Sequence, residues 1–102
     1  MIIYNVTCSV EPSVSEEWLQ WMRETHIPDV MESGIFKAAQ INKVLSEKDG
    51  GITYAIQYSC ESMKDLHNYQ VNFAPKLQKK HSQKYGDKVL AFRTLMEVIQ
   101  EY

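Results

Sequence analysis

The sequence contains few glycines, prolines and cysteines, and it has no excess of basic residues. Only 4 of its 102 residues are glycine, 3 are proline and 2 are cysteine, and 11 basic residues stand against 13 acidic ones. The net charge of -2 lacks the basic excess that a nucleic-acid-binding surface needs. No apolar run approaches the roughly 20 residues of a membrane-spanning helix. We therefore expect neither nucleic acid nor a membrane as a partner.

The two cysteines, Cys8 and Cys60, stand outside any Cys-x-x-Cys or His/Cys spacing, so they give no metal signal. Both fall on the apolar faces of predicted strands, which favours buried, reduced thiols. Because we expect these strands to be parallel neighbours, a disulfide between them stays geometrically conceivable. The sequence also lacks a Ser-His-Asp signature, a glycine-rich phosphate loop and a metal-ligand cluster. No metal and no cofactor are expected.

The length and composition are those of a globular protein. At 102 residues the chain predicts a single domain spanning residues 1–102. Hydrophobic residues make up 44% and charged residues 24%, close to the average of folded domains. The N-terminus has no charged region and no cleavage site of a signal peptide, so we expect a cytoplasmic protein.

Two segments, 2–10 and 52–60, alternate between apolar and polar residues. This period of two is typical of strands with one face buried in a core. The opposite faces carry small or polar residues, and two such faces side by side form either a wet surface or the lining of a cavity. The apolar positions are Ile2, Tyr4, Val6, Cys8 and Val10 in the first segment, and Ile52, Tyr54, Ile56, Tyr58 and Cys60 in the second.

The segment after the first predicted strand reads as a helix. Ser13 and Glu16 form a capping box, which predicts a helix from about Val14 to Met31. Pro28 must remove one hydrogen bond and bend or interrupt the last turn. Gly34 is placed to end the helix in a left-handed turn.

The second half repeats this order of elements. A strand over 35–45 leads through Asp49-Gly50-Gly51, a tight-turn sequence that predicts a hairpin with the strand at 52–60. Ser62 with Asp65 opens a second helix, whose apolar stripe runs on to about residue 85. Pro75 is expected to kink this helix. A last strand follows over 88–100. The apolar stripe consists of Met63, Leu66, Tyr69 or Gln70, Phe73, Leu77 and His81.

The order β-α-β-β-α-β predicts an α+β fold, a four-stranded antiparallel sheet with two helices on one face. The strands at 2–10 and 52–60 would be central. The other sheet face would be open, and either face of the strand at 88–100 leaves large apolar side chains uncovered. Such a surface marks an interaction face. A second copy of the chain is the simplest cover, so we expect a homodimer through the open sheet face.

The segment from Trp18 to Phe36 resembles the first helix and following turn of dimeric α/β-barrel proteins. It carries Trp18, Trp21, His26-Ile27-Pro28-Asp29-Val30 and Gly34-Ile35-Phe36. Together with the opening MIIYNVT, the hairpin around Gly50-Gly51 and the segment Gly86–Thr94, the whole chain resembles a family of short bacterial proteins of unknown function. The resemblance implies a ferredoxin-like fold that forms a dimeric α/β barrel. Its wider superfamily includes antibiotic-biosynthesis-type monooxygenases, haem-degrading enzymes and small-molecule binders, so fold does not settle function.

Haem-degrading members of the superfamily offer a test on residues. They resemble this chain in an asparagine on the first strand, which Asn5 matches. They also use a tryptophan and a histidine ten residues apart on the second helix, where this chain has Tyr69 and Lys79. The nearest histidine, His81, is displaced by two residues, which turns a helical side chain by roughly 200°. This departure argues against haem chemistry.

Five residues are candidates for a ligand site. Hydrogen bonds from Asn5, Thr7 and Gln57 would orient a ligand. Arg93 would bind an anionic group through two parallel hydrogen bonds. His26 is a weak candidate for a general base near neutral pH. Each also has a structural interpretation: solvent-facing or interface hydrogen bonds for Asn5, Thr7 and Gln57, a helix-end contact for His26, and an ion pair across a dimer for Arg93.

Three classes of function remain open. A homodimeric small-molecule-binding or interaction module comes first, because no catalytic constellation is visible. A cofactor-independent monooxygenase or isomerase acting on a small aromatic or polyketide-like molecule is the second, by analogy with the superfamily. The third is a structural protein-protein interaction domain. A pocket between helices and sheet lined by both Arg93 and Asn5 would favour a binder or an enzyme.

Overall fold

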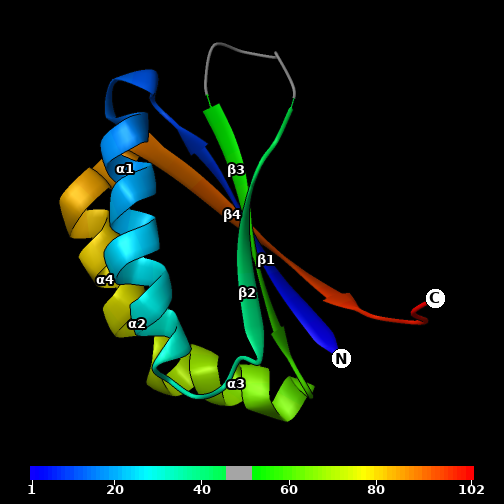
Figure 1. Cartoon of the computed structure of the whole chain (residues 1–102). Helices are drawn as coiled ribbons and strands as arrows, with labels where there is room; N and C mark the ends of the chain where they lie inside the picture. The colour runs from blue at the N-terminus through cyan, green and yellow to red at the C-terminus, as the bar shows by residue number, and fades with distance from the viewer. Residues whose placement is uncertain (46–51) are drawn as a thin grey trace.

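The chain folds in the predicted order of strands and helices (Figure 1). The computed structural model describes residues 1–45 and 52–102. The strands are β1 (Ile2–Val10), β2 (Ala38–Lys43), β3 (Ile52–Cys60) and β4 (Val89–Glu97). The helices are α1 (Ser15–Trp21), α2 (Ile27–Met31), α3 (Met63–Asn72) and α4 (Ala74–Tyr85). Shorter helical turns are η1 (Pro12–Val14), η2 (Met22–His26) and η3 (Gly86–Lys88).

The four strands form one antiparallel sheet in the order β2-β3-β1-β4, so β1 and β3 are central as predicted. The expectation that these two strands are parallel is wrong. The helical crossover leaves β2 running parallel to β1, and the reversal into β3 then inserts an antiparallel strand between them. This direction also rules out the conceivable disulfide. Cys60 pairs with Ile2, six positions along β1 from Cys8, which is a separation of about 20 Å. Both thiols are free and buried.

All helices of the described chain lie on one side of the sheet, and its other side is bare (Figure 1). The alternation in β1 and β3 is confirmed, because the apolar positions face the helices and form the core. Part of this core is an aromatic cluster, in which Tyr4, Phe36, Tyr58 and Tyr69 pack with ring centroids 4.8–6.1 Å apart. The buried core residues of the two central strands are Ile2, Tyr4, Cys8, Val10, Tyr54, Ile56, Tyr58 and Cys60.

The first helical segment differs from the prediction at its start. Ser13 does not cap a helix, since the segment begins one residue earlier with the 3₁₀ turn η1, and the cap of α1 is Val14. The side chain of Ser15 instead donates a hydrogen bond to the carbonyl of Pro12, at 3.3 Å. Proline fits the first turn because its missing N–H would have no acceptor there.

The same segment does not run as a regular α-helix to Met31. A π-helical turn, η2, separates α1 from α2, and Pro28 follows it by two residues. Pro28 has no N–H for the carbonyl of Glu24, and its ring clashes with that carbonyl in an ideal helix. The wider turn relieves this conflict and is the interruption that Pro28 predicted. Gly34 ends the segment with a φ of 75°.

The second helical segment follows the prediction more closely. The side chain of Ser62 accepts a hydrogen bond from the backbone N–H of Asp65, at 3.2 Å, so the predicted cap is confirmed. The helix breaks at Phe73, where α3 ends and α4 begins. Pro75 lies in the first turn of α4, which is the position where a proline is tolerated.

Both outer strands are shorter than predicted: β2 ends at Lys43 rather than at residue 45, and one end of each strand lies at or near the end of its partner. Ala38, not residue 35, begins β2, and it pairs with Ser59, one residue before β3 ends. Glu97, not residue 100, ends β4, and it pairs with Ile2 at the start of β1. The Asp49-Gly50-Gly51 turn lies outside the described residues.

The bare face of the sheet carries a row of apolar side chains on β4. Leu90, Phe92 and Met96 are 67%, 64% and 40% exposed. They lie on this face because β4 pairs with β1 so that Val89, Ala91 and Arg93 stand beside the helix-facing residues of β1. Within the described residues, no helix is both long and apolar enough to cross a membrane.

Candidate functional site

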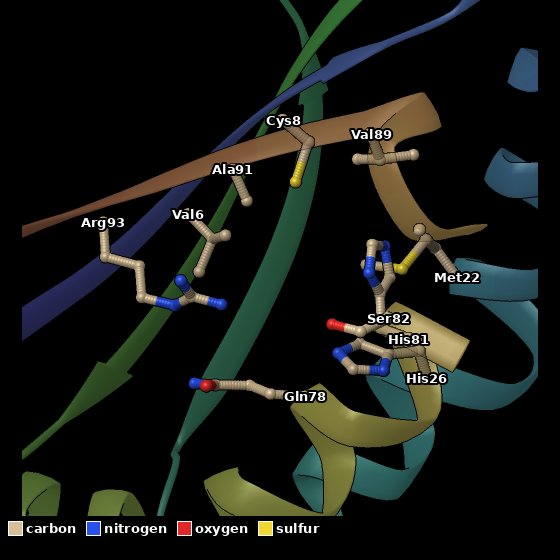
Figure 2. Close-up of a pocket in the computed structure, with 11 residues that line it drawn as sticks. Val6, Cys8, Met22, His26, Gln78, His81, Ser82, Val89, Ala91 and Arg93 are labelled. Atoms are coloured by element: carbon tan, nitrogen blue, oxygen red, sulfur yellow. The ribbon is translucent and has the colours of Figure 1, made fainter. Parts of the chain in front are cut away.

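A cavity of about 270 Å³ opens between the helices and the covered face of the sheet. Its sheet side comes from β1 and β4, and its helix side from η2 and α4 (Figure 2). We call it the pocket. The lining residues are Val6, Cys8, Met22, His26, Gln78, His81, Ser82, Gly86, Val89, Ala91 and Arg93.

A second cavity of about 40 Å³ adjoins the pocket, and we call it the extension. The two cavities share Val6, Met22, His26, Gln78 and Arg93. The extension is lined in part by the aromatic cluster of the core. Its further lining residues are Tyr4, Ile56, Tyr58 and Tyr69. A small occupant would therefore meet polar groups in both cavities and aromatic rings in the extension.

Arg93 supplies the fixed positive charge of the pocket. It comes from β4 beside Val6, and its guanidinium group points across the cavity toward the imidazoles of His26 and His81 (Figure 2). Its Nε donates a hydrogen bond to the hydroxyl of Tyr4, at 3.0 Å. Arg93 forms no ion pair within the described chain, and none of the described lining residues is acidic. Its terminal nitrogens are thus free to bind an anion.

His26 is the last residue of the π-helical turn η2, and its half-buried ring lines the pocket. Burial lowers the pKa of His26 to about 4, helped by the nearby His81 and Arg93 and opposed by Asp29. The side chain is therefore neutral at pH 7. It is a hydrogen-bonding group that accepts a proton only weakly.

His81 lies on α4, with its ring centroid 5.9 Å from that of His26. The indole Nε1–H of Trp18, a fully buried residue of α1, donates a hydrogen bond to Nε2 of His81, at 2.9 Å. Burial and the charge of Arg93 lower the pKa of His81. In the sequence His81 belongs to the apolar stripe of the second helix, and it was not predicted as a site residue. The feature that could have identified it is that it is the one histidine among the positions of that stripe.

The remaining polar groups of the pocket are neutral. Burial raises the pKa of the Cys8 thiol to about 11, against the opposing effect of Arg93, so Cys8 is not a thiolate nucleophile at neutral pH. Burial likewise raises the pKa values of Tyr58 and Tyr69, whose hydroxyls stay protonated. Among the described residues, no three His, Cys, Asp or Glu side chains are grouped as the ligands of a metal ion would be.

The sheet separates the five predicted site residues. Arg93 and His26 line the pocket, whereas Asn5, Thr7 and Gln57 lie on the bare face. There the amide of Asn5 donates to the hydroxyl of Thr7, at 2.9 Å, and the amide of Gln40 donates to Gln57, at 3.4 Å. One site containing all five is therefore impossible. Asn5 does not line the pocket.

A family model described as "Domain of unknown function (DUF4286)" matches residues 1–99. No sequence match to a curated protein was found.

Solved structures show the same fold at low sequence identity. A dimeric ferredoxin-like protein from an uncultured marine organism is 10% identical, with a TM-score of 0.74 over 99% of this chain and 96% of its own. A candidate antibiotic biosynthesis monooxygenase from Deinococcus radiodurans is 16% identical, with a TM-score of 0.71 over 100% and 96%. A protein of the ethyl tert-butyl ether D (EthD) family from Bacillus halodurans is 13% identical, with a TM-score of 0.69 over 97% and 100%. The chain thus has the ferredoxin-like α+β fold.

Proposed function

The chain belongs to the DUF4286 family of unknown function, and from its pocket we propose that it is a homodimeric protein that binds a small organic anion between its helices and its sheet. The observation that carries this proposal is the guanidinium group of Arg93, which faces a cavity whose described lining holds no carboxylate. A guanidinium group without a carboxylate partner can form an ion pair with an anion that binds in the cavity.

The size and lining of the pocket define the kind of ligand. At about 270 Å³ it lies just below the usual range of ligand pockets, roughly 300–1,000 Å³, so the ligand is small. Val6, Met22, Val89 and Ala91 offer apolar contacts, and the aromatic extension favours a flat body. His26 and His81, both neutral at pH 7, add hydrogen-bonding capacity without further charge.

The bare sheet face supports the second part of the proposal, the homodimer. Leu90, Phe92 and Met96 together expose more large apolar surface than a strand of a small monomer normally shows. A second copy packed face to face would cover this row and close the two sheets into a barrel. The similar structures described as dimeric have the same fold. Asn5, Thr7 and Gln57 would then be interface residues.

An enzyme is the second candidate, and the position of His26 favours it. A neutral imidazole faces a guanidinium group across the pocket (Figure 2). This pair can accept a proton from a bound acid while stabilising the resulting anion. The pKa of about 4 makes His26 a weak base unless a bound anion raises it.

Native mass spectrometry of the freshly purified protein tests both parts, because it reports the subunit number and any retained small molecule together. We expect a dimer that carries a ligand mass or takes up benzoate, a small aromatic anion. Arg93→Ala should lower benzoate binding at least tenfold, because a charge-assisted hydrogen-bonded pair is lost, and should leave the dimer intact.

Arg23→Ala is the matched control, since Arg23 is exposed on η2 and does not line the pocket. It should change neither property. Monomers after Arg93→Ala would make Arg93 an interface residue, and unchanged benzoate binding would remove it from the ligand site.

A further inference from the structure

The hydrogen bond between Trp18 and His81 determines which nitrogen of His81 carries the proton. The indole N–H of Trp18 can only donate, so Nε2 of His81, at 2.9 Å, must offer its lone pair. The proton of the neutral ring then sits on Nδ1. A second proton on Nε2 would bring two donors face to face, so this contact also opposes the charged form.

Nδ1 of His81 has no acceptor of its own in the described part of the chain. The only fully buried polar side-chain atom without a partner in the described chain is the hydroxyl oxygen of Tyr85, so Nδ1 of His81 is at least partly accessible. The His81 side chain lines the pocket. The N–H at Nδ1 therefore has no partner in the described chain, and an occupant of the pocket is the candidate acceptor.

We infer that Trp18 is a positioning residue that holds His81 as a neutral Nδ1–H donor, and that this donor makes the pocket select acids carrying a second oxygen acceptor, such as 2-oxo acids, over acids without one. This inference rests on the proposed binding of an organic anion. Arg93 would take the carboxylate, and His81 would donate to the neighbouring carbonyl oxygen. A neutral imidazole held as a donor can polarise a carbonyl in this way.

Trp18 is suited to this task because its position is fixed. The side chain is fully buried, and its ring packs against Tyr54 with a centroid distance of 5.2 Å. Trp21, one turn further along, also contacts His81, at 5.9 Å between centroids, but its indole nitrogen forms no hydrogen bond with that histidine. The chain thus contains its own control, a second tryptophan that touches the same imidazole without setting its tautomer.

The first test is ¹⁵N NMR of the histidine side chains in the unliganded protein at neutral pH. We expect Nδ1 of His81 to be the protonated nitrogen and Nε2 the acceptor. In Trp18→Phe the ring should move toward the Nε2–H form that free histidine prefers, while Trp21→Phe should keep the Nδ1–H form. An Nε2–H tautomer in the wild-type protein would overturn the inference without any variant.

The second test compares two probes, benzoylformate, which has a carbonyl beside its carboxylate, and phenylacetate, which lacks the carbonyl. We expect the wild-type protein to bind benzoylformate roughly three- to tenfold more tightly, the value of one hydrogen bond. Trp18→Phe and His81→Phe should remove this preference, and Trp21→Phe should retain it.

The two proposals fail in different ways. Equal binding of the two probes by the wild-type protein would overturn the role of His81 and leave the anion site standing. If neither probe binds, nor benzoate, the anion site itself is wrong, whereas the tautomer of His81 is still decided by the NMR spectrum.

Discussion

The two faces of the sheet differ in their side chains, although the same strands form both. On the covered face, β1 contributes Tyr4 and Cys8 to a buried core and Val6 to a pocket. On the bare face, one residue further along, the same strand carries Asn5 and Thr7, which hydrogen-bond to each other. The alternation of a strand allows one segment to build an interior and a surface at once.

β4 differs from β1 because both of its faces carry apolar residues. Its covered face has the small Val89 and Ala91, and its bare face the larger Leu90 and Phe92. The small residues under the helices leave room for the pocket, and the large residues opposite need a cover. The cavity and the exposed apolar row thus come from the same strand, on opposite sides.

Equal substitutions on the two sides should give unequal losses of folding free energy. Leu66→Ala removes a fully buried side chain of α3 and should cost about 3–4 kcal/mol, because it leaves a cavity in the core. Leu90→Ala, on the bare face, should cost the protomer about 1 kcal/mol or less. Urea denaturation of the dissociated protomer measures both, and a comparable loss in the two variants would contradict the assignment of the faces.

A charge on the bare face should break association without unfolding the protomer. Phe92→Glu should weaken the dimer by about 2 kcal/mol or more, since a desolvated aromatic contact becomes a buried charge. Light scattering across a dilution series should then give the monomer mass. Val71→Glu is the matched control, an exposed apolar residue on α3 that should leave the dimer unchanged. Dimers of Phe92→Glu would place the interface elsewhere.

Acid should destabilise the covered side through His26. Its folded pKa of about 4 lies below the ordinary 6.5, so the unfolded chain binds the proton first between these values. The stability due to the neutral ring is complete above about pH 6.5 and falls as the pH drops toward 4. For a half-buried ring we expect about 1–2 kcal/mol. His26→Gln should flatten this part of the pH profile from thermal denaturation, whereas His67→Gln, exposed on α3, should follow the wild type.

Much of the fold could be predicted from local patterns. Alternation over 2–10 and 52–60 gave the central strands with their bounds, and Ser62 gave the start of α3. The start of the first helix could not be predicted in this way. Ser13 has the sequence of a cap, but Pro12 opens a 3₁₀ turn one residue earlier. Directions of strands are also not local, since the antiparallel pairing of β1 with β3 follows from the connections.

The site was less accessible to sequence reasoning. Arg93 was grouped with Asn5 and Gln57, but both alternating sets of β4 are apolar, so the sequence does not show which set faces the helices. The pairing of Arg93 with Val6 decides this, and it is a contact between distant segments. His81 was visible only as a polar member of an apolar stripe. Its importance depends on how α4 packs against α1 and η2.

The π-helical turn η2 holds both Met22 and His26 over the pocket. Such a turn contains one residue more than an α-helical turn, so the chain on either side is out of phase by about 100°. Deleting Glu24 would remove one residue from this turn and rotate one end of the segment relative to the other. The number of residues in η2 therefore determines which side chains of this segment face the pocket. In a relative one residue shorter here, another side chain would face the ligand.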